Sequence, residues 1–374
     1  MTLNSFTPLN RLLMGPGPSN VHPRVLKAIS QPTIGHLDPQ FIGLMDNIKS
    51  LLRYAFQTEN EVTFAVSGPG SVGMETCLVN LIEPGDKVIV CINGVFGGRM
   101  KDIVERCGAT PIDVTAPWGS AIDPGELEDK LKQNKDVHLV AFVHAETSTG
   151  AKSDIKTLAE IAHKFDCITV ADTVTSLGGI SLQIDEWKID CTYSGTQKCL
   201  SCPPGLSPVS FNQRAVDRII NRKSKVQSWF MDINLILDYW GNGAKRTYHH
   251  TAPINSLYGL HEALLILKEE GLEQSWERHK LNGQKLITEL GSIGLLPYVK
   301  ANERLPELTS IAVPSEIDES KVRKQLLEEY NIEIGAGLGE LAGKIWRIGL
   351  MGYTSTEENV NTFVNAINDI LENK

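Results

Sequence analysis

Short apolar runs alternate with stretches of helical periodicity along the first two-thirds of the chain. The runs are apolar along their whole length, as expected of strands that are buried on both faces. They occupy residues 61–67, 87–93, 137–145 and 167–173. The segments between them, at 70–82, 94–108 and 154–165, have the spacing of apolar residues that is typical of amphipathic helices. Helices between such strands predict an α/β fold with a mostly parallel sheet that is covered on both sides.

The pattern changes after about residue 270. A long helical segment at 271–293 precedes a strand at 307–314, a helix at 319–331, a strand at 344–350 and a final helix from Glu357. This order is typical of a smaller α+β domain. Residues 1–20 are rich in proline and glycine, and we interpret them as an arm that lies against the rest of the chain. We therefore predict an arm over 1–20, a large domain over 21–270 and a small domain over 271–374.

Composition and charge exclude several classes of protein. The 374 residues are 41% hydrophobic and 22% charged, which is ordinary for a globular protein and excludes a disordered or collagen-like chain. With 36 basic and 45 acidic residues the net charge is −9. We expect no nucleic-acid partner, because phosphate contacts need clustered basic side chains. The basic run from Arg214 to Lys225 is interpreted as the solvated face of a helix.

The cysteines and the absence of long apolar stretches bear on the compartment. No stretch reaches the roughly 18 apolar residues that span a bilayer, so no membrane partner is expected. Seven cysteines, an odd number scattered among apolar neighbours, are typical of reduced intracellular thiols. We therefore expect a cytoplasmic protein. Cys199 and Cys202 form a lone CxxC pair, and we expect no metal there, since zinc needs further ligands at suitable spacing.

A glycine-rich turn joins the run at 61–67 to the following helix. Gly68, Gly70 and Gly73 spell GxGxxG, the fingerprint of dinucleotide binding. That interpretation also needs an acidic residue at the end of the second strand, where this chain has Asn93. A nicotinamide oxidoreductase is therefore the weaker alternative. A tight strand–helix turn that binds no ligand remains a second interpretation. A turn of this kind before a helix also suits a phosphate, because it presents backbone N–H groups.

Two charged residues stand where parallel strands end. Asp172 closes the run at 167–173, and Lys198 follows the short strand and loop at 191–198. Most lysines are surface charges, but small residues lead to Lys198 and a rigid Pro-Pro-Gly follows it, so it is a candidate for Schiff-base chemistry. Pyridoxal phosphate needs an anion site, a partner for its pyridine nitrogen and a lysine. The glycine turn, Asp172 and Lys198 together meet these needs.

With these motifs the chain resembles the class V pyridoxal-phosphate aminotransferases of fold type I, and within them the alanine–glyoxylate and serine–pyruvate aminotransferase group. The resemblance covers nearly the whole chain. It is carried by LLMGPGPSN, SGPGSVGMET, NGVFGGR, HAETSTG, ADTVTSLGG, YSGTQKCLSCPPG, YHHT and KIWRIGLMG. It implies a large domain with a mostly parallel sheet between helices, a smaller C-terminal α+β domain and pyridoxal 5'-phosphate as cofactor.

The resemblance also implies a role for each matching residue. Lys198 would carry the cofactor covalently and Asp172 would pair with its pyridine nitrogen, so both would be catalytic. Val174 and Phe96 would lie on the two faces of the ring, although relatives often have tryptophan in place of Phe96. The other cofactor contacts would come from Pro69, Gly70, Ser71, Thr147, Gln197, Tyr248 and Thr251. Arg347 would bind the substrate carboxylate, with Thr147 and His36 also on the substrate side.

The implied reaction is a transamination from a small amino acid, alanine or serine, to glyoxylate or pyruvate. Tyr248 and Thr251 typically reach the phosphate of the neighbouring subunit, so a homodimer with composite active sites is expected. A lyase such as a cysteine desulfurase is less favoured, because it needs a cysteine well after the lysine and the last one here is Cys202. A catalytically inactive scaffold is also disfavoured, since all the expected groups are present.

The ureidoglycine–glyoxylate branch of the family is the nearest alternative in substrate. In that branch amide side chains occupy the positions that match His36 and Tyr248. An amide both donates and accepts hydrogen bonds, which suits a ureido group. An imidazole and a phenol do not reproduce that contact, and a site that lacks it rejects such a substrate strongly. We therefore expect small donors, with glyoxylate as the favoured acceptor.

Overall fold

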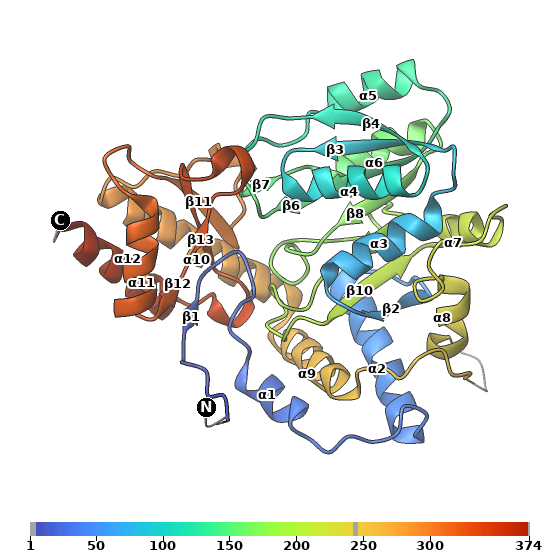
Figure 1. The fold of residues 1–374 in the computed structure, drawn as a ribbon, viewed down its shortest axis with the longest axis horizontal. Helices are drawn as coiled ribbons and strands as arrows, with labels where there is room; N and C mark the ends of the chain where they lie inside the picture. Colours follow the sequence, from blue (N-terminus) through green and yellow to red (C-terminus); the bar gives the residue numbers. More distant parts are fainter. Residues whose placement is uncertain (1–4, 242–245, 373–374) are drawn as a thin grey trace, which may run out of the picture.

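The computed structural model describes residues 5–241 and 246–372, and within them the centre of the molecule is a seven-stranded sheet (Figure 1). Its strands are β2 (Val62–Ser67), β3 (Lys87–Ile92), β4 (Thr110–Thr115), β5 (Val137–Val143), β8 (Ile168–Asp172), β9 (Cys191–Tyr193) and β10 (Leu206–Phe211). They lie in the order β2-β10-β9-β8-β5-β3-β4. Neighbours from β9 to β4 run parallel, and β10 is antiparallel to both β9 and β2. The mostly parallel sheet is thus confirmed.

Helices separate the strands as the periodicity predicts. They are α1 (Pro23–Ile29), α2 (Pro39–Phe56), α3 (Gly70–Leu81), α4 (Val95–Arg106), α5 (Pro124–Gln133), α6 (Ile155–Lys164), α7 (Gln213–Ile220), α8 (Ile233–Trp240) and α9 (Ile254–Glu270). Every residue of β8 and β10 is buried, so these central strands are covered on both faces. The carboxyl ends of β8 and β9 lie beside the start of α3, which brings Asp172, the loop of Lys198 and the glycine turn together.

A second group of elements packs beside the large sheet (Figure 1). It holds α10 (Leu272–Ser292), α11 (Glu319–Glu329), α12 (Glu357–Glu372) and an antiparallel sheet of β11 (Leu308–Ala312), β14 (Ile345–Gly349) and β13 (Gly335–Ala336). Short 3₁₀ helices lie at Ala301–Glu303, Gly339–Leu341 and Gly352–Thr354. This group has its own core, which includes Leu286, Trp346 and Phe363. The division of the chain at residues 20 and 270 stays a prediction.

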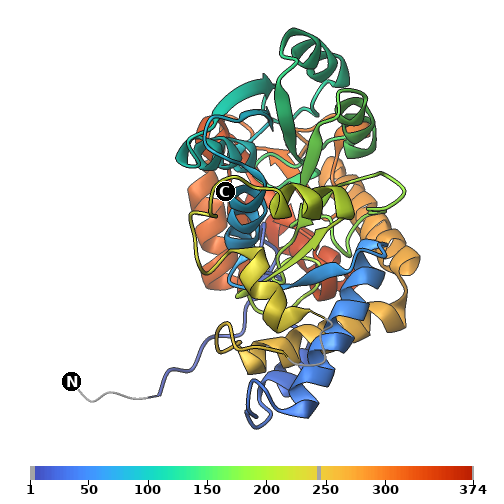
Figure 2. The same cartoon turned by 90° about the vertical axis from the view of Figure 1, so that its right-hand side faces the viewer.

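The arm joins the two groups of elements. β1 (Leu12–Leu13) pairs in parallel with β12 (Ile332–Glu333), and Met14 belongs to the second core. Residues 5–10 are exposed and run away from the body of the molecule (Figure 2). Residues 1–4 of the predicted arm lie outside the described residues. A small hairpin of β6 (Ala145–Glu146) and β7 (Ala151–Lys152) completes the strands that frame the site.

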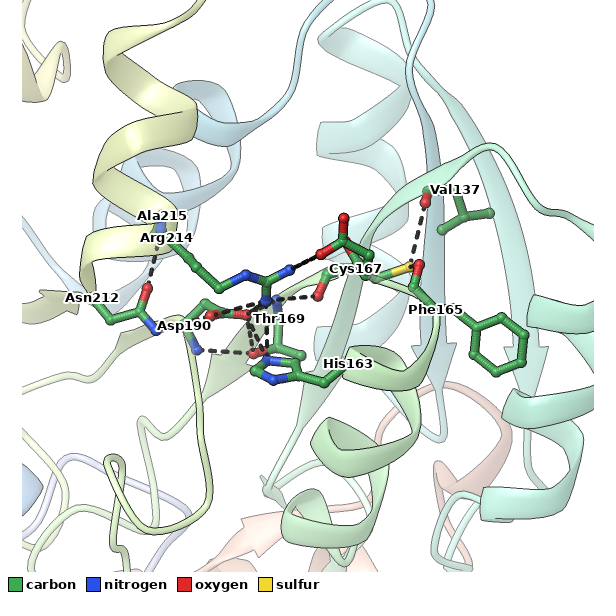
Figure 3. A network of polar contacts seen from close by, with 10 residues as sticks. Val137, His163, Phe165, Cys167, Thr169, Asp190, Asn212, Arg214 and Ala215 are labelled. Atoms are coloured by element: carbon green, nitrogen blue, oxygen red, sulfur yellow. Dashed lines mark hydrogen bonds and ion pairs between the residues drawn. The ribbon is translucent and has the colours of Figure 1, made fainter.

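The basic run at 214–225 is not simply a solvated helix face, so that interpretation is corrected. Arg214 Nη1 lies 3.1 Å from Asp190 Oδ2, and Asp190, which is fully buried, also accepts a hydrogen bond from the Thr169 N–H at 2.9 Å (Figure 3). Arg218 pairs with Asp86 at 2.6 Å. These arginines are partly buried because carboxylates from distant segments, the buried Asp190 and the partly buried Asp86, pair with them.

Candidate active site

The two predicted catalytic residues are both buried at the carboxyl ends of neighbouring strands. Asp172 ends β8 and is 3% exposed, and Lys198 follows β9 by a short loop and is 8% exposed. Asp172 Oδ1 accepts a hydrogen bond from the Val174 N–H at 2.9 Å, and Asp172 Oδ2 accepts one from the Tyr193 hydroxyl at 2.7 Å. The carboxyl group is therefore fixed in orientation, with Val174 next to it.

Burial changes the acidity of both groups. It raises the pKa of Asp172 from 3.8 to about 6, against the two hydrogen bonds that stabilise the ionised form. Burial, and after it the charge of Arg347, lowers the pKa of Lys198 from 10.5 to about 8. The amine of Lys198 thus gives up its proton more easily than an ordinary lysine, which a group that both takes and returns a proton requires.

The glycine turn places the start of α3 beside the carboxylate and the lysine loop. Pro69 precedes the helix and supplies no side-chain cap, so the first-turn N–H groups at Gly70 and Ser71 are available to an anion. A β-carbon at Gly70 would lie 3.3 Å from Val174 Cγ2 and 3.7 Å from the Gly195 Cα. A side chain at this position would require Val174 to move by a few tenths of an ångström. The Ser71 hydroxyl is 3.1 Å from Arg99 Nη1, which brings a cation to the same place.

Phe96 is held by two residues that the sequence analysis did not single out. Its N–H donates to Glu146 Oε2 at 3.2 Å, and Glu146 is fully buried. The Ser148 hydroxyl donates to Glu146 Oε1 at 2.6 Å. Glu146 and Ser148 stand in the HAETSTG motif, and Tyr193 stands in the strand before Lys198. The motifs contained all three residues, but nothing in their spacing pointed to Phe96 or Asp172 as partners.

Arg347 enters the site from β14 and contacts Thr147. The arginine is 6% exposed and Thr147 is 2% exposed. Arg347 Nη1 donates to the Thr147 carbonyl at 2.9 Å, and Nε donates to the Ala336 carbonyl at 2.6 Å. Nη2 has no hydrogen-bond partner among the described residues. Burial lowers the pKa of Arg347 to about 10, so it remains a cation at neutral pH, with donors left for a carboxylate.

His36, Tyr248 and Thr251 form a separate group within one chain. The rings of His36 and Tyr248 lie 5.2 Å apart, Tyr248 is 59% exposed, and Thr251 is also exposed. No described contact joins them to Lys198 or Asp172. His250 of this segment contacts the residue before the glycine turn, since its Nε2 is 2.7 Å from the Ser67 hydroxyl.

The remaining arrangement fits pyridoxal phosphate. It combines a buried amine, a buried carboxylate and a helix start that is suited to a phosphate. Gln197, next to Lys198, has a buried amide oxygen that lacks a hydrogen-bond partner among the described residues. Such an atom is rare in a folded protein and is typical of a site that completes its contacts with a bound group. Val174 and Phe96 are both only partly buried, as ring-facing side chains must be before the ring is present.

Comparisons with known proteins agree with this geometry. The family described as "Aminotransferase class-V" matches residues 12–363. Alanine–glyoxylate aminotransferase of Rattus norvegicus is 42% identical over 364 residues, which is 97% of this chain and 88% of the rat protein. The crystal structure of alanine–glyoxylate aminotransferase from Nostoc sp. matches with a TM-score of 0.97 and 45% identity, over 99% of this chain and 98% of that one.

A relative with another substrate is nearly as similar. The crystal structure of ureidoglycine–glyoxylate aminotransferase from Bacillus subtilis matches with a TM-score of 0.96 and 38% identity, over 99% of this chain and 95% of that one. The family resemblance is confirmed across both groups. The chain therefore belongs to the class V aminotransferases, which are pyridoxal-phosphate-dependent enzymes.

Proposed function

We propose that this aminotransferase moves the amino group of alanine or serine to glyoxylate or pyruvate. The observation that carries the proposal is that Lys198 and Arg347 are both buried in one site, where Arg347 keeps donors for one small carboxylate. The relatives at 42% and 45% identity are named alanine–glyoxylate aminotransferases, which supports the same substrates here.

The cofactor contacts follow from the positions of the side chains. When bound, pyridoxal phosphate supplies an aldehyde that takes up the amino group and a ring that withdraws electrons from the α-carbon. Pro69, Gly70, Ser71 and Gln197 would bind its phosphate end. Asp172 would face the ring nitrogen, and Val174 and Phe96 would lie on the two ring faces. Thr147, whose carbonyl accepts a hydrogen bond from Arg347 at 2.9 Å, would lie within reach of both cofactor and substrate.

Two residues of the chain then act on the substrate. Arg347 binds the substrate carboxylate and thereby sets which bond at the α-carbon is held for cleavage. Lys198 Nζ would take the α-proton as a general base and later give it back as a general acid. Its lowered pKa, near 8, suits both roles around neutral pH.

Substrate choice separates this proposal from ureidoglycine transamination. Here the ring centroids of His36 and Tyr248 lie 5.2 Å apart, and neither side chain presents a donor and an acceptor side by side as an amide does. We expect kcat/KM with glyoxylate to be at least about tenfold higher for alanine or serine than for ureidoglycine. The measurement is a panel of these three donors against glyoxylate and pyruvate. A preference for ureidoglycine would overturn the substrate assignment but not the transaminase reaction.

A homodimer with composite active sites and a cytoplasmic location complete the proposal. Tyr248 and Thr251 are exposed in one chain, as expected of residues that reach a partner's phosphate. Phe6, at 89% exposure, and Trp229, at 64%, add apolar surface that a second copy would cover. All seven cysteines are free, which supports a reducing compartment. Among the residues that the structure describes, no helix is long and apolar enough to cross a membrane.

A further inference from the structure

Hydrogen bonds join the arm to both sides of the candidate active site. On one side, the Met14 carbonyl accepts a hydrogen bond from the Gly349 N–H at 2.7 Å, two residues after Arg347 on β14. On the other side, the Ser19 N–H donates to the Gln197 carbonyl at 2.9 Å, and the Ser19 hydroxyl donates to the Lys198 carbonyl at 2.8 Å. The turn of residues 15–18 is thus held between the strand of Arg347 and the loop of Lys198.

That turn meets the end of the Lys198 side chain. Lys198 Nζ donates a hydrogen bond to the Pro16 carbonyl oxygen. Gly17 has a φ of +103°, in the region that favours glycine, and a β-carbon there would lie 2.7 Å from both Nζ and Cδ of Lys198. At Gly15, in the same turn, the nearest atom to such a carbon would be 3.7 Å away. Position 17 therefore has no room for a side chain while Lys198 lies here.

We propose that Pro16 and Gly17 form a resting site for the Lys198 amine during the phase of turnover in which it is not attached to the cofactor. The Pro16 carbonyl accepts its hydrogen bond, and the missing side chain at Gly17 leaves the space for it. This proposal rests on the proposed transaminase function and deepens it. Pro16 and Gly17 are positioning residues, because they act through Lys198.

The resting site serves the proton transfer in two ways. A free lysine side chain has many rotamers, and a fixed acceptor selects those that keep Nζ inside the site. A carbonyl can only accept a hydrogen bond, so the lone pair of the neutral amine stays free to take a proton. The arm is hydrogen-bonded to the strand of Arg347. The Lys198 amine is therefore held in a fixed position relative to the substrate carboxylate that Arg347 binds.

The test is a double-mutant cycle, read by thermal unfolding of cofactor-free protein. Gly17→Ala is introduced into three backgrounds: wild type, Lys198→Met, which keeps most of the side-chain volume, and Lys198→Ala, which removes it. Gly17→Ala should lower Tm in all three backgrounds through backbone strain, and we expect the loss to be measurably larger in the first two, where the end of the side chain at position 198 must also move. Backbone strain at position 17 is common to all three and cancels in the comparison. Equal losses in all three backgrounds would overturn the proposal.

A second measurement uses the loaded enzyme and does not depend on the stability of the Lys198 variants. Gly17→Ala should lower kcat by about tenfold or more while KM for alanine changes little, because Arg347 is untouched. Gly15→Ala is the matched control and should change neither. An unchanged kcat in Gly17→Ala would also overturn the resting site. Failure of the transaminase proposal would look different, since the wild-type enzyme would then not transaminate although the Tm coupling was present.

Discussion

Asp172 combines a buried carboxyl group with two donors that orient it. Asp172→Asn keeps the shape but removes the charge that would face a pyridinium, so we expect turnover to fall by about 100-fold or more with the fold intact. Tyr193→Phe, which removes only the 2.7 Å hydrogen bond to Asp172, should cost less. Turnover with alanine and glyoxylate, together with circular dichroism, measures both effects. Wild-type turnover in Asp172→Asn would mean that Asp172 merely binds the Val174 N–H.

Glu307 is a second buried carboxyl group, outside the reaction. It is fully buried beside Leu305 and Leu308, and neither of its oxygens has a hydrogen-bond partner among the described residues. Burial raises its pKa from 4.5 to about 8. Between these two pH values the folded chain holds a proton that the unfolded chain has released. The contribution of Glu307 to the free energy of unfolding is therefore fully present below about pH 4.5 and is lost as the pH rises to about 8.

This sign gives a stability prediction. Glu307→Gln keeps a neutral group of the same shape. At pH 8 it should therefore raise Tm and increase the free energy of unfolding by an amount on the order of a few kcal/mol. It should also flatten the fall in Tm from pH 5 to pH 8. Differential scanning calorimetry at several pH values measures it. The exposed Glu316→Gln is the control and should leave the pH profile as it is. Equal slopes for wild type and Glu307→Gln would contradict the assignment.

Helix α4 is capped by another segment rather than by its own sequence. Gly94 precedes it and supplies no side-chain hydrogen bond. Instead the Ser148 hydroxyl accepts a hydrogen bond from the Val95 N–H at 3.0 Å, and Glu146 accepts one from the Phe96 N–H. The hairpin of β6 and β7 thereby fixes the first turn of α4, which carries the ring of Phe96.

Removing this cap should affect both stability and cofactor binding. Ser148→Ala should lower stability by about 1 kcal/mol, as is usual for a lost cap, and should weaken cofactor binding several-fold, since the turn that carries Phe96 loses its bond at Val95 and Glu146 loses a donor. Chemical denaturation and cofactor titration measure the two effects. Asp123→Ala, which removes the cap of the distant helix α5, should cost similar stability but leave the cofactor affinity unchanged. Equal cofactor affinities in both variants would refute the role of Ser148.

The elements differ in how far their sequence predicts them. Strand β8 and helix α5 follow from local signals, a fully apolar run and an Asp-Pro start, and the rule for parallel strands then places Asp172 at the site. The contact of Glu146 with Phe96 spans 50 residues, and no local pattern encodes it. The inward arginines of the run at 214–225 were misjudged for the same reason, because their partners Asp86 and Asp190 lie far away in the sequence. Glu307 is buried by the packing of two groups of elements, which hydrophobic periodicity does not report.

A pair of chains, rather than one, is the expected working unit, because one chain leaves Tyr248 and Thr251 apart from Lys198. The prediction is complementation. Chains with Lys198→Ala and chains with Tyr248→Phe and Thr251→Val should each have little activity alone. In a mixed dimer one site has an intact lysine from one chain and an intact Tyr248 and Thr251 from the other. Random mixing in equal amounts should therefore restore about one quarter of wild-type activity, because half of the dimers are mixed and one of their two sites works.

If Tyr248 and Thr251 served their own chain, no mixed dimer would hold a complete site and mixing would restore nothing. In the control, chains with Tyr248→Phe and Thr251→Val are mixed with chains that carry these two substitutions and Lys198→Ala. No complete site can then form, whether Tyr248 and Thr251 serve the partner or their own chain. Analytical ultracentrifugation at assay concentration accompanies the measurement. An active monomer, or dimers that exchange without regaining activity, would contradict composite sites, because the exposed Tyr248 and Thr251 would then complete the site of their own chain or none.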